Sequence, residues 1–218
     1  MENTELGLCM RNNMEMFRNC LNAVPPRERF VYVEIGIYNG DTIKLVAEHL
    51  SKSRPAFIAF AVEAPFWVEQ NSRVASQRMG EWWDGRALSD PLIEGDIDRL
   101  KPNKIHVLPI GSGAFLKDSG VRPDAVFIDG CHSAKCTMMD FVLCELVMSA
   151  GGVVMLHDID PGYQGLDDQY HCKSKIQVLA ACEKLKLLPV LQRPGWKTIG
   201  QSKEGFETHS LLVLQKTG

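Results

Sequence analysis

Several side chains able to do acid, base or metal chemistry stand directly after short apolar stretches of the chain. They are Asp129, His132, His157 and Asp158. Two converging carboxylates suit a hard, oxygen-preferring cation such as Mg²⁺, which would orient a hydroxyl group and lower its pKa. An imidazole titrates near neutral pH and can accept the proton of that hydroxyl. We therefore take these four residues as the candidate catalytic set.

A carboxylate and two glycines mark the end of the first apolar run. Gly36 and Gly40 have the spacing G-x-x-x-G, whereas a dinucleotide site needs G-x-G-x-x-G. Glu34 would repel a pyrophosphate but would attract an ammonium group, and glycines let a ligand approach the backbone closely. Glu63 ends the next apolar run, where an acid can accept both hydroxyls of a ribose. The pattern favours a nucleoside with an ammonium group, with a plain strand-to-helix turn as the alternative.

Alternating apolar and amphipathic stretches predict the elements that would position these residues. Strands are expected at residues 30 to 36, 56 to 62, 105 to 110, 124 to 128, 153 to 156, 187 to 191 and 210 to 214, and helices at 8 to 22, 41 to 51, 67 to 79, 134 to 149 and 173 to 185. Residues 80 to 100 have no clean period, which indicates an irregular insertion.

This alternation predicts a Rossmann-like, doubly wound α/β fold. Its mostly parallel, seven-stranded sheet would carry helices on both faces, with the last two strands as an antiparallel edge. No linker divides the chain, so residues 1 to 218 are expected to form a single domain. Ligands of such sheets bind at the carboxyl ends of the strands, where the candidate residues stand.

Two motifs carry a resemblance to a known family. Residues 33 to 42 resemble motif I of class I methyltransferases that depend on S-adenosylmethionine (SAM). The run F-I-D-G at residues 127 to 130, then His132-Ser133, an acid at Asp140 and G-G-x-x-x-x-H-D at residues 151 to 158 are similar to one subgroup of that family. The subgroup includes small-molecule and sugar O-methyltransferases, some of them magnesium-dependent. The resemblance covers about residues 30 to 160.

The resemblance implies a SAM site whose residues are Glu34, Gly36, Tyr38, Gly40, Glu63, Ser112 and Asp129. Glu34 and the glycines would contact the methionine part, Glu63 the ribose hydroxyls, and Asp129 would lie next to the methyl donor. Ser112 is a candidate for the adenine edge, with a simple tight turn as the alternative.

The resemblance also implies a metal site. In metal-dependent relatives, acids at the positions of Asp129 and Asp158 hold the cation, with a third ligand beside the second acid. That third position is His157 here, where some relatives have an acid, and Ile159 replaces the asparagine of the catechol-type enzymes. The alternative is that His157 and Asp158 only tie down loops by hydrogen bonds, and that His132 is structural.

The expected activity is methylation of a hydroxyl of a small molecule or sugar. Three alternatives stay open: a SAM-binding module without turnover, an NAD or nucleotide-sugar enzyme on a similar fold, and a methyltransferase acting on protein or nucleic acid. A net charge of -3 makes a nucleic-acid partner unexpected. No apolar run is long enough to span a membrane.

The seven cysteines are an odd number, and Cys144 and Cys182 lie in apolar stretches. Such cysteines are typical of a reducing compartment, so the expected location is the cytoplasm. A zinc site at Cys131, His132 and Cys136 is disfavoured because their spacing matches no common ligand pattern. The sequence leaves a homo-oligomer open.

Overall fold

A computed structural model describes residues 6–37, 39–88, 92, 96–130, 133–157, 194–201 and 211–218. The helices are α1 (Leu6–Ala23), α2 (Asp41–Ser53), α3 (Pro65–Met79), α4 (Ser112–Asp118) and α5 (Ala134–Val147), with short 3-10 helices η1 (Gly80–Trp82) and η2 (Asp96–Arg99). The strands are β1 (Phe30–Ile35), β2 (Phe57–Glu63), β3 (Trp83–Ala87), β4 (Lys104–Pro109), β5 (Ala125–Ile128), β6 (Val153–His157), β7 (Trp196–Gln201) and β8 (Leu211–Lys216).

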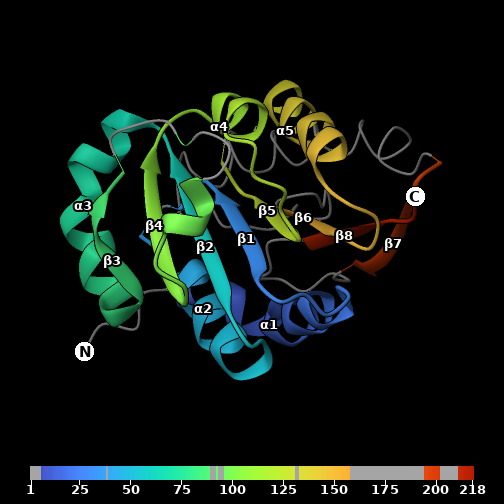
Figure 1. The fold of residues 1–218 in the computed structure, drawn as a ribbon, viewed down its shortest axis with the longest axis horizontal. Coiled ribbons are helices and arrows are strands. Elements are labelled where there is room, and N and C mark those ends of the chain that lie inside the picture. The colour runs from blue at the N-terminus through green and yellow to red at the C-terminus, as the bar shows by residue number, and fades with distance from the viewer. Residues whose placement is uncertain are drawn as a thin grey trace, which may run out of the picture.

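The strands form one sheet in the order β3-β4-β2-β1-β5-β6-β8-β7 (Figure 1). The first six strands along the chain pair in parallel, while β8 is antiparallel to both β6 and β7. The strand order reverses between β1 and β5, and the carboxyl ends of the parallel strands share one edge. This confirms the Rossmann-like, mostly parallel α/β fold, with eight strands in the described part instead of the seven predicted.

Helices cover both faces of the sheet (Figure 1). One apolar cluster joins one face to α1, α2 and α3, and a second joins the opposite face to α4 and α5. Tyr32 belongs to the first cluster and its neighbour Val33 to the second, because successive strand side chains point to opposite faces. Burial on both faces explains why these strands are apolar throughout rather than alternating.

The differences from the predicted elements have local causes. The insertion at residues 80 to 100 contains β3, a five-residue strand with the sequence WDGRA, which shows no clear apolar alternation. Its pairing with β4 also shifts register between Trp83 and Ala87. Helix α4 has only seven residues and begins in a glycine-rich stretch that predicts a turn. Strand β7 is a largely exposed edge strand with few apolar residues. The predicted helix at 173 to 185 and strand at 187 to 191 lie outside the described residues.

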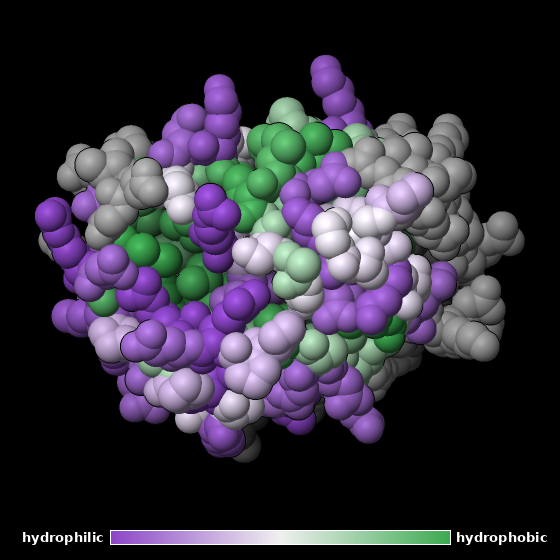
Figure 2. All heavy atoms as spheres, turned by 45° about the vertical axis from the view of Figure 1, so that its right-hand side comes forward, coloured by the Kyte–Doolittle hydropathy of each residue, from purple (hydrophilic) through white to green (hydrophobic). Residues whose placement is uncertain are grey.

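The surface in Figure 2 is mostly hydrophilic, with an area of apolar side chains near the top, at the height of α4 and α5 in Figure 1. On α5, Met139 is 51% exposed and Leu146 is 74% exposed. None of the helices in the described ranges combines the length and the apolar character needed to cross a membrane.

Candidate functional site

The ends of β2, β1 and β5 are joined where the strand order reverses. The amide of Gly36 donates to Val62 O over 2.9 Å, and the amide of Asp129 donates to Ile35 O over 2.9 Å. Gly36 has φ +84°, and a Cβ there would lie 2.4 Å from Gly130 Cα. Only glycine allows this approach, so the backbone brings the three strand ends together at the predicted site.

Glu63 holds the loop that follows β1. Its Oε2 accepts a hydrogen bond from the Ile37 amide over 3.1 Å, and its Oε1 accepts one from the Ala64 amide over 2.8 Å. Gly40, at φ +82°, closes the same loop as its amide donates to Ile37 O over 2.7 Å. Glu63 therefore shapes the predicted cofactor loop, and its contact with a ribose stays a prediction.

Glu34 lies beneath this loop and is 1% exposed. Tyr32 Oη donates to its Oε2 over 2.9 Å, and the backbone N–H of Ile43 also donates to the carboxyl. Ile43 is in the first turn of α2, whose N-cap residue Gly40 provides no side-chain hydrogen bond. Glu34 thus satisfies one of the N–H groups that a helix start leaves open.

Three acids at the carboxyl ends of the strands, Glu34, Glu63 and Asp129, are close enough for their charges to interact. Burial raises the pKa of Glu34 well above its ordinary value, and the charges of Asp129 and Glu63 raise it further. The hydrogen bonds from Tyr32 and Ile43 act in the opposite direction. Removing acids from water while placing them near one another favours a positively charged ligand, since such a ligand relieves both penalties.

Asp129 and His157 form a direct pair across β5 and β6. His157 Nδ1 lies 2.8 Å from Asp129 Oδ1, and the two side chains are 9% and 27% exposed, respectively. The imidazole also stands edge-on to Phe127, with centroids 5.7 Å apart and planes at 69°. Phe127 is in turn in edge contact with Phe17 of α1, at 5.2 Å. Aromatic packing therefore fixes the His157 side of the pair, while Asp129 is the more exposed of the two residues.

Ser112 is the first residue of α4, and its hydroxyl donates to Asp140 Oδ1 over 2.6 Å. Asp140 belongs to α5 and is 3% exposed, and burial raises its pKa. The hydroxyl therefore joins α4 to α5. The predicted contact of Ser112 with an adenine edge stays a prediction.

Three predicted site residues, Tyr38, His132 and Asp158, lie outside the described residues. The metal site needs Asp158, and within the described ranges no three His, Cys, Asp or Glu side chains are grouped as a metal site would require. The described pair of Asp129 and His157 does not by itself fit Mg²⁺, which prefers a shell of oxygen ligands. The magnesium site accordingly stays a prediction.

Two residues that shape the site were not predicted from the sequence. Gly130 meets Gly36 at the strand crossing, and Tyr32 donates to Glu34. A signal existed for Tyr32, because residues two apart on a strand share a face and can interact. No local signal existed for the contact of Gly130 with Gly36, which depends on the pairing of β1 with β5.

A separate cavity of about 340 Å³ lies beside the edge strand β3. Its lining residues are Asp84, Gly85, Leu88, Arg99, Leu100 and Lys101. None of the predicted site residues is among them. The cavity is therefore distinct from the cluster of acids at the carboxyl ends of the strands.

The fold and this edge of the sheet define a class I, Rossmann-like methyltransferase fold. A family model described as a methyltransferase domain matches residues 33–159, which is more than half of the chain. The chain therefore belongs to the methyltransferase domain family. A search of curated proteins finds no significant sequence match.

Solved structures agree with this fold at low sequence identity. A putative rRNA-methylase from Clostridium thermocellum matches with a TM-score of 0.60 and 11% identity, covering 94% of this chain and 97% of that one. A putative caffeoyl-CoA O-methyltransferase from Staphylococcus aureus matches with a TM-score of 0.56 and 14% identity, covering 99% and 85%. The O-methyltransferase TomG from Streptomyces achromogenes, in complex with SAM, matches with a TM-score of 0.55 and 14% identity, covering 100% and 92%.

Proposed function

We propose that the chain is a SAM-dependent methyltransferase that methylates a hydroxyl of a small molecule or sugar. The observation that carries the proposal is the cluster of acids Glu34, Glu63 and Asp129 at the carboxyl ends of β1, β2 and β5. Its position is the ligand-binding edge of the fold, in a chain of the methyltransferase domain family.

The cluster fits SAM by charge. Asp129 and Glu63 both raise the pKa of the buried Glu34, so the acids of this site repel one another. SAM carries an ammonium group and a sulfonium, and both charges are complementary to such a site. NAD and nucleotide-sugars carry a pyrophosphate instead, which the same acids would repel. The charge of the cluster therefore favours SAM over these ligands.

SAM supplies an activated methyl group, so the protein has to position the acceptor and receive its proton. The carboxyl of Asp129 is the exposed member of its pair with His157, and it accepts the hydrogen of the acceptor hydroxyl in our proposal. His157 Nδ1–H donates to Asp129 Oδ1, which orients the carboxylate and stabilises its charge. The proton that leaves the hydroxyl during methyl transfer is taken up by this pair.

Three observations support the proposed class of acceptor. A paired carboxylate and imidazole suit a hydroxyl, which has to lose a proton as it is methylated. Several similar structures are those of O-methyltransferases, although the rRNA-methylase is equally similar in fold. The net charge of -3 disfavours a nucleic-acid acceptor. We therefore propose a small hydroxyl compound as the partner of the site.

Calorimetric titration of the purified, chelator-treated protein with SAM tests the cofactor, with and without added Mg²⁺. We expect micromolar binding to the wild type that is weakened in Glu34→Gln. Formation of S-adenosylhomocysteine (SAH) with a catechol and a monosaccharide then tests the acceptor class. Asp98→Asn is a matched control, since Asp98 is an exposed acid paired with Arg29, which precedes β1 at the opposite end of the strand from the site.

Failure of the wild type to bind SAM in both conditions would contradict the proposal. Binding that appears only with Mg²⁺ would support the predicted metal site through Asp158. Binding without turnover of any hydroxyl compound would favour a SAM-binding module that does not catalyse.

A further inference from the structure

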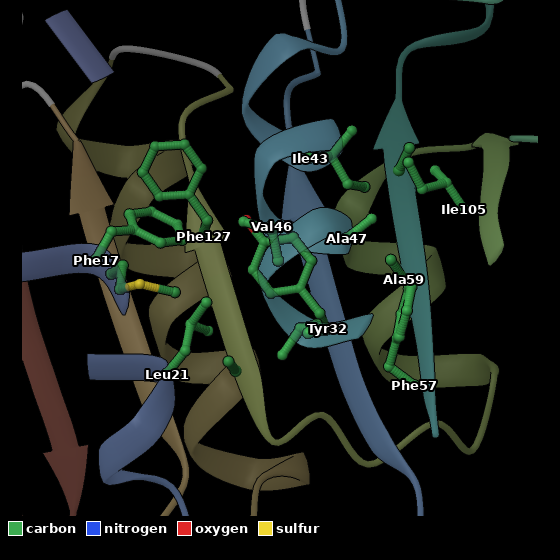
Figure 3. Close-up of a cluster of buried hydrophobic side chains, with 14 of the residues drawn as sticks. Phe17, Leu21, Tyr32, Ile43, Val46, Ala47, Phe57, Ala59, Ile105 and Phe127 are labelled. Carbon is green, nitrogen blue, oxygen red and sulfur yellow. The ribbon is translucent and has the colours of Figure 1, made fainter. Parts of the chain in front are cut away.

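Tyr32 is a buried polar side chain to which the proposed methyl transfer gives no role. Its exposed fraction is 0%, and it lies in the first apolar cluster with Phe17, Val46 and Phe127 (Figure 3). A buried phenol hydroxyl needs a hydrogen-bond acceptor, and Tyr32 Oη donates to Glu34 Oε2 over 2.9 Å. The hydroxyl therefore holds one oxygen of the acid that we place at the cofactor site.

Tyr32 is also electrostatically coupled to the proposed catalytic pair. Burial raises the pKa of its phenol, and the charge of Glu34 and the hydrogen bond to it add to this, followed by the charge of Asp129. Asp129 is itself bonded to His157. A row of polar groups thus runs from His157 on β6 through Asp129 after β5 to Glu34 and Tyr32 on β1.

Both recorded donors to Glu34 are neutral groups. They are the Tyr32 hydroxyl and the backbone N–H of Ile43, and each favours the ionised carboxylate against burial and the neighbouring acids. The N–H of Ile43 is a backbone group at the start of α2, so any residue at this position other than proline would provide it. Tyr32 is the side chain that this particular chain adds to that support.

We propose, on the basis of the proposed SAM site, that Tyr32 is a positioning residue for the amino-acid end of the cofactor, acting through its hydrogen bond to Glu34. Tyr32 does not touch the cofactor. Its hydrogen bond orients the Glu34 carboxyl and acts against the rise that burial causes in its pKa, so that the carboxylate forms more readily when the ammonium group of the ligand binds. The nucleoside end is held by other groups, and Tyr32 has no effect on it.

The test is calorimetric titration of the wild type and Tyr32→Phe with three ligands: SAM, SAH and methylthioadenosine. The third has the same nucleoside and sulfur but no amino-acid group. Loss of a hydrogen bond to a charged group should weaken the binding of SAM and SAH by about tenfold. The affinity for methylthioadenosine should stay within about twofold, because this ligand has no ammonium group for Glu34 to attract.

Two further variants separate positioning from simple loss of packing. Val46→Ala opens a cavity in the same cluster but leaves the Tyr32–Glu34 bond in place, and it should lower the melting temperature without selectivity among ligands. Glu34→Gln keeps a partner for the Tyr32 hydroxyl but removes the charge, and it should reproduce the selective loss. Adding Tyr32→Phe to Glu34→Gln should then have little further effect on the binding of SAM.

The outcomes distinguish this inference from the function on which it rests. A wild type that binds neither SAM nor SAH would overturn both. A wild type that binds them, with a Tyr32→Phe variant that binds all three ligands normally or loses all three equally, would overturn only the role of Tyr32. If Tyr32→Phe does not fold, the selectivity of Glu34→Gln decides, and an equal loss of all three ligands there also overturns the inference.

Discussion

Two acids are buried at opposite ends of the parallel strands, Asp124 at the amino ends and Glu34 at the carboxyl ends. The charged groups near Asp124 are positive, and those near Glu34 are negative. At the amino edge, Asp124 is 9% exposed, accepts the Val31 amide over 2.9 Å and lies 3.4 Å from Arg27 Nε. At the carboxyl edge, Glu34 is 1% exposed and its recorded donors are a phenol hydroxyl and a backbone N–H.

The electrostatics of the two acids differ accordingly. Burial raises the pKa of both side chains. The charges of Arg27 and Arg54 then lower the pKa of Asp124, whereas the charges of Asp129 and Glu63 raise that of Glu34 still further. An acid that holds the fold together receives its counter-charge from the chain. The described groups around Glu34 bring no positive charge, and we interpret Glu34 as an acid that receives its counter-charge from a ligand.

The largest expected effect comes from disrupting the close backbone contact between Gly36 and Gly130 at the carboxyl ends of β1 and β5. In Gly36→Ala the new Cβ meets the Gly130 backbone at a positive φ, so we expect a loss of about 3 kcal/mol or more and no SAM binding. Gly151→Ala is the matched change at the amino edge, with the same φ of +84° but a clash only with the Pro25 ring. It should lower the free energy of unfolding and spare SAM binding. Denaturant unfolding and calorimetry check both variants, and SAM binding by Gly36→Ala would break the comparison.

Asp129→Asn should reduce kcat for methyl transfer by about 100-fold or more, because the amide cannot receive the acceptor's proton. Its fold should be retained, since an amide oxygen can still accept from His157 Nδ1. The measurement is the rate of SAH formation at saturating SAM, with Asp98→Asn as the surface control. A kcat near that of the wild type would remove Asp129 from the proposed mechanism.

Asp124→Asn tests the amino edge. We expect a loss of about 1 kcal/mol of stability or less, since the hydrogen bond to Val31 can persist and only the attraction to the exposed Arg27 is lost. The affinity for SAM should not change. Glu34→Gln should show the reverse result near neutral pH, with weaker SAM binding and little loss of stability. Identical behaviour of the two variants in both assays would contradict the assignment of one structural and one ligand-binding acid.

The pH dependence of stability sharpens the same contrast. Because the folded-state pKa of Glu34 lies well above 4.5, the folded protein binds more protons than the unfolded chain as the pH rises above that value. The contribution of Glu34 to stability is present below pH 4.5 and is lost as the pH rises toward its folded-state pKa. The stability of the wild type relative to Glu34→Gln should therefore fall with rising pH, as measured by urea unfolding over a pH series. A difference that grows with pH would show that the folded state favours the ionised carboxyl.

A similarly small effect is expected of Ser112→Ala. Removing its hydroxyl takes a donor from the buried Asp140, which should cost about 1 kcal/mol of stability. If the hydroxyl serves only α4 and α5, the dissociation constant for SAM should stay within about twofold of the wild type. Substantially weaker SAM binding would instead support the predicted contact with the adenine edge.

The sequence by itself determined the class of fold, and it predicted the edge of the sheet at which we propose that the chemistry takes place. Buried β-branched runs and amphipathic stretches are local patterns, so β1, β2, β5, β6 and the long helices were predicted within a few residues. Glu34, Glu63, Asp129 and His157 could be found because each ends or follows such a run. Short or exposed elements were not predicted: β7 has few apolar residues, and α4 is too short to show a period.

Only the tertiary structure decided which of these groups meet. His157 joins Asp129, Glu63 holds the Ile37 amide, and Ser112 donates to Asp140. Each contact links segments that are 26 to 28 residues apart in the chain. Hydrogen-bond partners of this kind depend on strand order and register, which are set by long-range pairing and are not encoded in any local pattern. The pairing of β1 with β5 brings Gly36 onto Gly130, and together with the pairing of β1 with β2 it brings three acids to one edge. Local sequence patterns could place each of these residues only separately.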